Sequence, residues 1–272
     1  MCVDELLCTL NSSGFGCTIK QTSFNALMFA DDILLLTISI ADLRQLLYIC
    51  HDELRTLDMS INIAKTSFVR IGPRSGVDIA PVKLNRAEIA VSSEIRYLGV
   101  TILGGVRFRC DFHGKKIKFY RALNAIMSKI GAPSEIALIL HLVSTNCNSI
   151  LMYGLEACSL TKKQLTSLAY SYNSVYFKLF NTFDPIVVKQ VQYFCGYLPF
   201  PPAVQLRTLS FLNDLQRDRI SPAGKIFSWE GVSEFRELQV KFNIEAGCSP
   251  ARYRTKVWAD VYNKMNQELD TI

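Results

Sequence analysis

Two short apolar runs flank a pair of aspartates early in the chain. Residues 27–30 read Leu-Met-Phe-Ala and residues 33–36 read Ile-Leu-Leu-Leu, with Asp31 and Asp32 between them. Runs of this length are too short for independent helices, so the pattern predicts two strands joined by a tight turn, with the acidic pair at the tip. Because side chains alternate along a strand, we expect Leu27, Phe29 and Asp31 to share one face, with Met28 and Ala30 on the other. Asp31 would then be the stronger metal ligand, and Asp32 would be a supporting ligand.

An amphipathic helix is predicted over residues 41–57, where it would cover the sheet that contains the hairpin. Ser39 and Asp42 have the spacing of a capping box, and apolar residues follow on one face at helical spacing, namely Leu43, Leu46, Leu47, Cys50, Leu54 and Leu57. A strand is expected over residues 67–71, with the hairpin as its candidate partner. Residues 82–102 alternate between apolar and polar positions with two interruptions, which predicts short antiparallel strands.

The pattern becomes helical from about residue 110. Helices are predicted over 111–130, 134–157, 161–180 and 185–195, the last with Pro185 in its first turn and Gly196 beyond its end. A further helix is predicted from Pro250 to about Glu268, with Ser249 as its cap. The proline-rich residues 198–202 are expected to form a rigid boundary between helical segments. The predicted fold class is therefore α+β, a small antiparallel sheet with a covering helix followed by a mostly α-helical region.

Composition indicates a folded intracellular protein. The chain has 272 residues, 49% of them hydrophobic and 20% charged, which is enough for one large or two smaller domains. Nine cysteines at scattered spacings, without a signal-like amino terminus, favour reduced thiols in the nucleus or cytoplasm. The longest apolar stretch, residues 136–143, is too short to span a bilayer and contains His141, so we expect no membrane association.

The acidic pair is the strongest candidate for chemistry. Two adjacent carboxylates beside apolar surface repel each other unless a cation neutralises them. Oxygen ligands without nearby His or Cys favour Mg²⁺ or Mn²⁺, which suit phosphate chemistry. The alternative is a plain polar turn, because Asp is favoured in turns for its local hydrogen bonds.

Four sequence blocks around this pair resemble reverse transcriptases, specifically those of non-LTR, LINE-like retrotransposons. The first is Phe29-Ala30-Asp31-Asp32 with its apolar flanks, which resembles the catalytic hairpin of that family. The other three follow in the family's order, at residues 58–66 ending in Lys65-Thr66, at residues 95–100 around Tyr97-Leu98-Gly99, and at residues 151–157. The resemblance covers roughly residues 1–160.

The resemblance implies a role for each matching residue. Asp31 and Asp32 would be catalytic and would bind Mg²⁺ or Mn²⁺, and Lys65 would assist the leaving pyrophosphate as a proton donor or a cation. Phe29 would lie, partly exposed, near the primer end or the incoming nucleotide, and Tyr97, Leu98 and Gly99 would form the primer-grip hairpin. The alternatives are a solvated Lys65 and aromatic rings that serve only the core. The implied partners are an RNA template, a DNA primer and deoxynucleotides.

The resemblance also implies a third carboxylate, on a strand well before the hairpin, for which we find no candidate. Asp4 is expected to lie on a helix end instead. We therefore expect a fragment, the carboxyl-terminal part of the palm plus the thumb, without the fingers. The expected ranges are residues 1–104 for the partial palm, 105–197 for a thumb-like helical region and 198–272 for a helical region of unknown role.

Positive charge is concentrated directly after the third block. Residues 105–130 contain seven basic residues and one acidic residue, so their net charge equals the +6 of the whole chain. Such a block favours contact with a nucleic-acid backbone, whereas a merely solvated helix face usually carries both signs. We expect Lys115, Lys118 and Arg121 to share one helix face, with Phe112, Phe119 and Leu123 pointing inward. The predicted backbone contacts are Arg107, Arg109, Lys115, Lys116, Lys118 and Arg121.

Three functions fit the sequence to different degrees. The first is a fragment of an RNA-directed DNA polymerase, which we expect to be inactive alone. Whether the full product contains the missing carboxylate distinguishes this function from the second. The second is a non-catalytic module that binds RNA or an RNA–DNA hybrid through the basic helix. The third is a receiver-type signalling domain, which the nearly all-helical second half disfavours.

Overall fold

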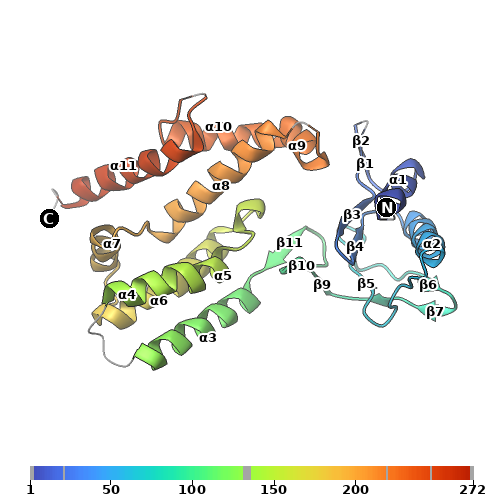
Figure 1. Cartoon of the computed structure of the whole chain (residues 1–272), viewed down its shortest axis with the longest axis horizontal. Helices are drawn as coiled ribbons and strands as arrows, with labels where there is room; N and C mark the ends of the chain where they lie inside the picture. The colour runs from blue at the N-terminus through green and yellow to red at the C-terminus, as the bar shows by residue number, and fades with distance from the viewer. Residues whose placement is uncertain (1–2, 21, 131–135, 219, 246, 270–272) are drawn as a thin grey trace. The chain divides into compact units, whose positions relative to one another are not determined.

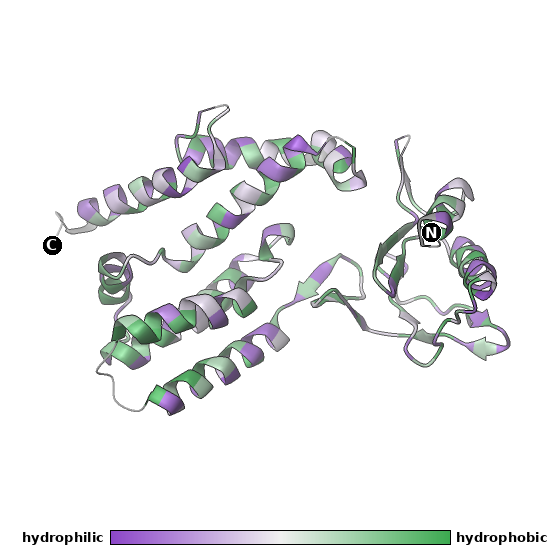
Figure 2. Ribbon diagram, viewed as in Figure 1, coloured by the Kyte–Doolittle hydropathy of each residue, from purple (hydrophilic) through white to green (hydrophobic). Residues whose placement is uncertain are grey.

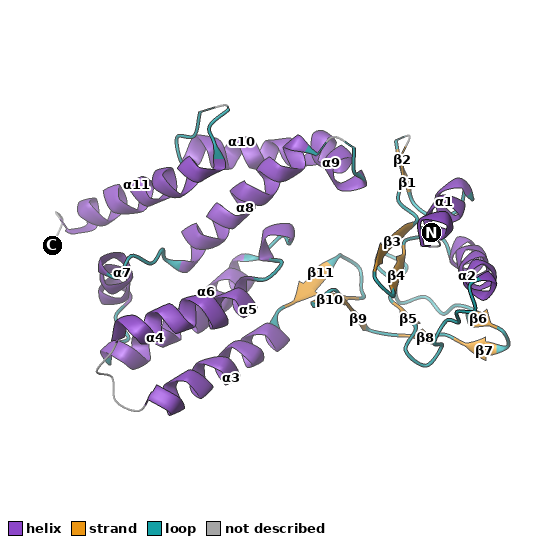
Figure 3. Cartoon of the chain, viewed as in Figure 1, coloured by secondary structure: helices purple, strands orange, loops and turns teal. Residues whose placement is uncertain are grey.

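The chain, described by a computed structural model, forms two compact units, residues 1–111 and 112–272 (Figure 1). The structure describes residues 3–20, 22–130, 136–218, 220–245 and 247–269. Strands occur only in the first unit among these residues, and helices make up most of the second (Figure 3). The α+β class is therefore confirmed. The finer division into three ranges, with a boundary at residue 198, remains a prediction.

A two-stranded hairpin contributes to the core of the first unit. Strands β3 (Ala26–Phe29) and β4 (Asp32–Leu35) pair in antiparallel fashion, and helices α1 (Val3–Ser12) and α2 (Ile40–Thr56) cover them. The shared core joins apolar residues of all four elements, namely Leu6, Leu10, Ala26, Met28, Ile33, Leu35, Leu46, Cys50 and Leu54. Each fully buried leucine contributes about 2 kcal/mol to this packing.

Helix α2 forms where the sequence predicts it. The Ser39 side chain accepts a hydrogen bond from the backbone N–H of Asp42 at 3.0 Å, which satisfies one free donor of the first turn. The predicted apolar stripe is buried from Leu43 to Leu54, while Leu57 lies just past the end of the helix as its C-cap. The expected covering helix is thus confirmed.

The other strands of the first unit are short. Antiparallel pairs join β1 (Thr18–Ile19) to β2 (Thr22–Ser23) and β6 (Lys83–Leu84) to β7 (Ala87–Glu88). Strands β9 (Glu94–Tyr97), β10 (Val100–Leu103) and β11 (Arg109–Asp111) form a three-stranded antiparallel sheet.

Two strand predictions need correction. The antiparallel strands expected over residues 82–102 are present except at residues 90–91, which pair in parallel. The strand expected over residues 67–71 is only β5 (Ser67–Phe68), and it pairs in parallel with β8 (Ala90–Val91) rather than with the hairpin. Beyond β5 the backbone forms hydrogen bonds with Gly105 instead of continuing the strand. The N–H of Gly105 donates to the carbonyl of Arg70, and the N–H of Gly72 donates to the carbonyl of Gly105.

The second unit is helical over its described residues. It comprises α3 (His113–Ile130), α4 (Ile136–Leu142), α5 (Asn148–Met152), α6 (Lys162–Phe180), α7 (Pro185–Phe194), α8 (Phe200–Arg217), α9 (Pro222–Ile226), α10 (Val232–Lys241) and α11 (Pro250–Leu269). The predicted helices over 111–130, 161–180, 185–195 and 250–268 are confirmed. Residues 195–199 separate α7 from α8, so the expected boundary at 198–202 only partly holds, because Phe200, Pro201 and Pro202 form the first turn of α8. The predicted helix over 134–157 is segmented, with π-helical turns at Val143–Cys147 and a 3₁₀ turn at Leu155–Ala157, and its first two residues lie outside the described ones.

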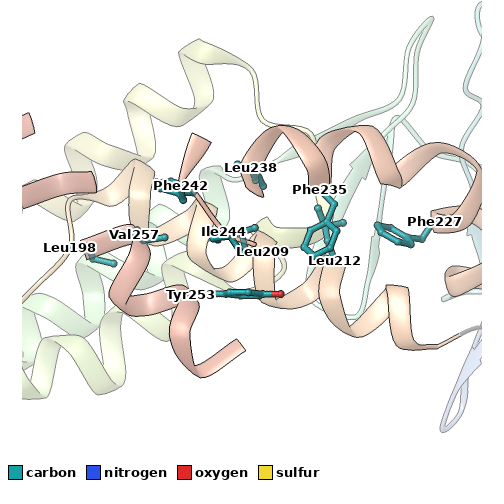
Figure 4. Packing of buried hydrophobic residues seen from close by; sticks show 10 residues of the cluster. All are labelled: Leu198, Leu209, Leu212, Phe227, Phe235, Leu238, Phe242, Ile244, Tyr253 and Val257. Carbon is teal, nitrogen blue, oxygen red and sulfur yellow. The ribbon is translucent and has the colours of Figure 1, made fainter. Parts of the chain in front are cut away.

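A hydrophobic cluster joins the last helices of this unit (Figure 4). Leu209 and Leu212 of α8 pack against residues of α10 and α11, including Phe235 and Val257, and all are buried. The Tyr253 hydroxyl donates to the amide oxygen of Asn213 at 3.1 Å, so the polar tip of this buried ring is satisfied.

One helical stretch of the described residues, Ile136–Ala157, is long and apolar enough to cross a bilayer by length and composition alone. Its apolar character is visible along α4 in Figure 2. The stretch also supplies buried core positions, including Leu140, Val143, Cys147 and Leu151. Since core helices pass the same test, this is weak support for a membrane span.

Candidate active site

The turn of the β3–β4 hairpin holds the acidic pair. Phe29 pairs with Asp32, which leaves Ala30 and Asp31 as a two-residue loop. Ala30 has a φ of +53°, a conformation that costs a residue with a Cβ about 1 kcal/mol. A positive φ in the loop is typical of the mirror-image turns that join hairpin strands, whose twist matches that of the flanking strands.

The hairpin has one buried face and one open face. Met28 and Ile33 form a cross-strand pair that points into the core, while Phe29 is 63% exposed on the opposite face. The expected partial exposure of Phe29 is confirmed. Asp31 and Asp32 are both exposed.

The expected arrangement of the two aspartates is wrong in one respect. Strand alternation alone placed Asp31 beside Phe29, whereas the register places Asp32 directly opposite Phe29 on the open face. The reason is that a two-residue turn ends the alternation of β3, and a new alternation starts at Asp32. Asp31 lies in the turn itself.

Tyr97, which is far from the acidic pair in sequence, senses the charge of Asp32. It ends β9 opposite Val100 of β10, and Leu98 and Gly99 form the turn between the two strands with φ values of +45° and +78°. Burial raises the pKa of Tyr97, and the negative charge of Asp32 raises it further. The first and third sequence blocks are therefore linked by the effect of the Asp32 charge on the pKa of Tyr97.

Asn25 fixes the hairpin to the rest of the unit and was missed in the sequence. It is fully buried, and its side-chain NH₂ group donates to the backbone carbonyl of Leu10 at 3.0 Å. The backbone carbonyl of Asn25 accepts from the backbone N–H of Leu36 at 2.8 Å. Gly16 makes room for it, because a Cβ on Gly16 would lie 2.8 Å from the Asn25 side-chain oxygen. A single polar residue directly before an apolar strand was the signal that could have revealed it.

The loop that carries Lys65 is ordered by its neighbours. The N–H of Lys65 donates to the side-chain oxygen of Asn62 at 3.2 Å, and the Thr66 hydroxyl donates to the carbonyl of Asn62 at 2.8 Å. Asn62 and Thr66 thus order this loop. The Lys65 side chain is exposed, and its action on a leaving group remains a prediction.

The basic residues after the third block do not form one uniform surface. Arg107 and Arg109 are exposed in the first unit, and Lys118 and Arg121 are exposed on α3. Lys116 is half-buried and donates to the Ser167 hydroxyl at 2.9 Å.

Lys115 departs from the expected position. It is only 8% exposed, its amino group donates to the carbonyl of Tyr153, and it lies 5.3 Å and 5.5 Å from the ring centres of Phe112 and Tyr153. A step of four residues turns a helix by about 40° beyond a full circle, so Lys115 lies close to the buried Phe119. Lys118 and Arg121 lie progressively farther round the helix from Lys115, away from this buried position. Phe112, Phe119 and Leu123 point inward as predicted.

The donor set of the hairpin suits one hard divalent ion better than two. Mg²⁺ is commonly held by one or two carboxylates, with water and substrate phosphates completing its ligands, and Asp31 and Asp32 can supply the carboxylates. Within the described residues, no group of three or more His, Cys, Asp or Glu side chains is arranged to hold a metal ion. A two-ion site would need a further carboxylate.

Comparison with known proteins agrees with this geometry. Residues 1–102 match the family model described as reverse transcriptase (RNA-dependent DNA polymerase). No curated protein and no solved structure matched the chain. The matched range contains the acidic hairpin, the Lys65 loop and the Tyr97 turn, and it ends before α3. This part of the chain is similar to the reverse transcriptase domain, and the similarity supports a nucleotidyl-transfer activity of that type.

Proposed function

We propose that the first unit is the carboxyl-terminal part of the palm of a non-LTR, LINE-like reverse transcriptase, acting in the nucleus or cytoplasm. The observation that carries the proposal is the open face of the hairpin, where Asp32 lies opposite the exposed ring of Phe29. The charge of Asp32 also raises the pKa of Tyr97. A substrate on this face would meet a carboxylate and an aromatic ring at once.

The proposed reaction joins a deoxynucleotide to the 3′ end of a DNA primer on an RNA template. Asp31 and Asp32 would hold Mg²⁺ or Mn²⁺, which when bound supplies charge neutralisation at the transferring phosphate. The chain's own residues would position the reactants. Phe29 would contact the primer end or the nucleotide, the turn at Leu98 and Gly99 would support the primer strand, and Lys65 would donate a proton or positive charge to the leaving pyrophosphate.

We further propose that the described residues do not suffice for turnover. In-line displacement between two ions needs a third carboxylate, and positioning of the nucleotide needs a clamp such as the fingers. Both would come from a segment on the amino-terminal side of the hairpin.

Binding of Mn²⁺ tests the carboxylate assignment without requiring activity. Electron paramagnetic resonance can follow free Mn²⁺ during titration with the whole chain. We expect weak binding that is lost in Asp32→Asn and reduced in Asp31→Asn, with an unchanged circular dichroism spectrum. Equal Mn²⁺ binding by wild type and by the Asp31→Asn, Asp32→Asn double variant would overturn the assignment.

A second candidate function is nucleic-acid binding without catalysis. The exposed cations Lys118 and Arg121 on α3 favour it, because they lie in the segment whose charge equals that of the whole chain. If the binding survives loss of both aspartates and no extended form of the chain polymerises, this candidate replaces the first.

A further inference from the structure

The second unit contains a groove between α3 and α6 that the proposed polymerase site does not use. Its volume is about 630 Å³, and its walls come from both helices. None of the residues that line it is acidic. The lining side chains that matter here are His113, Lys116 and Tyr120 from α3 and Lys163, Ser167 and Tyr170 from α6.

Positive charge comes from both walls of the groove. Lys116 is half-buried and its amino group is directed to the Ser167 hydroxyl at 2.9 Å, so its position is fixed. Lys163 and His113 are exposed. Two lysines with an adjacent hydroxyl, and no carboxylate among the lining residues, form a site suited to a phosphate.

Aromatic rings also come from both walls, and each is held in place. Tyr170 is 59% exposed, and its ring packs against Phe177 with centres 5.5 Å apart. Tyr120 packs edge-on against the fully buried Phe119 at 5.6 Å. Rings that are held by a neighbour and still reach solvent offer a stacking surface at little entropic cost.

Phosphate-binding cations and exposed rings in one groove define the ligand class. We propose that this groove binds a single strand of nucleic acid, with a base against Tyr120 or Tyr170 and an adjacent phosphate at Lys116 and Lys163. In a duplex the base faces are already stacked, so the tyrosines would have no surface to meet. A free mononucleotide is usually enclosed by its site, whereas this groove is flanked by exposed Lys163 and Tyr170, which suits part of a longer polymer.

The proposal can be tested with the whole chain and a fluorescein-labelled single-stranded RNA of about 12 nucleotides, followed by fluorescence anisotropy. Tyr170→Leu should weaken binding about tenfold, whereas Tyr170→Phe, which keeps the stacking face, should bind like wild type. Lys163→Ala should lower the slope of log affinity against log salt by about 0.7. Tyr48→Leu and Lys225→Ala are matched controls, because both residues are exposed and neither lines the groove.

Three results would overturn the proposal. These are unchanged binding in both groove variants, equal affinity for a duplex of the same sequence, and full competition by AMP at the affinity of the strand. Asp32→Asn should leave single-strand binding intact, so the groove and the polymerase assignment can fail independently.

Discussion

Phe29 and Asp32 lie directly opposite each other across the β3–β4 ladder, on the face that points away from the core. This pairing makes Asp32 the carboxylate that shares a surface with an exposed aromatic ring. It also places the turn residue Asp31 one position further out, where its side chain does not belong to the ladder.

The chain alone is expected not to extend a DNA primer on an RNA template. The described residues provide two neighbouring carboxylates, which cannot hold two ions in the geometry of in-line displacement. A primer-extension assay with labelled deoxynucleotides and Mg²⁺ or Mn²⁺ measures this directly. Magnesium-dependent incorporation that disappears in Asp31→Ala would contradict the expectation.

Gly16→Ala is expected to destabilise the first unit more than Gly14→Ala. Both glycines have positive φ, at +103° and +76°, so both substitutions strain the backbone. Only at Gly16 would the new Cβ collide with Asn25, while nothing lies within 4 Å at Gly14. Urea denaturation compares the two variants, and equal free energies of unfolding would show that Asn25 simply moves aside.

Lys115→Ala is expected to lower stability, and Lys118→Ala is expected to lower the salt dependence of nucleic-acid binding. Lys115 is buried and makes a charge-assisted hydrogen bond to the carbonyl of Tyr153, worth about 1.5–3 kcal/mol. Lys118 is exposed, so its loss should leave the free energy of unfolding nearly unchanged. Thermal unfolding and a binding titration at several salt concentrations separate the two effects. A reversed pattern would restore Lys115 to the binding face.

Stability of the second unit is expected to fall as pH rises above about 10. Burial raises the pKa of Tyr172 from 10.0 to about 12, so the unfolded chain loses this proton first. The stabilisation is complete below pH 10 and is lost as pH rises through the folded pKa.

Tyr172→Phe provides the control for this pH dependence. Its hydroxyl donates to the carbonyl of Leu198 at 2.9 Å, so the variant should lose about 1 kcal/mol at neutral pH. It should also show a shallower loss of stability above pH 10 in urea denaturation. An identical pH profile in wild type and variant would assign the alkaline loss to other groups, such as Tyr176, whose pKa burial also raises.

The sequence by itself determined the elements whose signals are local. The apolar stripe of α2, the Ser39 cap and the helices of the second unit follow from spacing and capping residues within a few turns. The acidic hairpin was equally readable, because two apolar runs around Asp31 and Asp32 leave few other arrangements.

Tertiary structure decided what depends on turn length and on partners distant in sequence. Whether Asp31 or Asp32 faces Phe29 depends on a turn of two residues, since one residue more or less would exchange the faces of β4. Lys115 is buried because the carbonyl and ring of Tyr153 come to meet it, which helical spacing alone could not reveal. Likewise, Lys116 and Lys163 share a groove only because α3 packs beside α6. Local pattern fixes which residues can form an element, whereas packing between elements fixes which side chains meet.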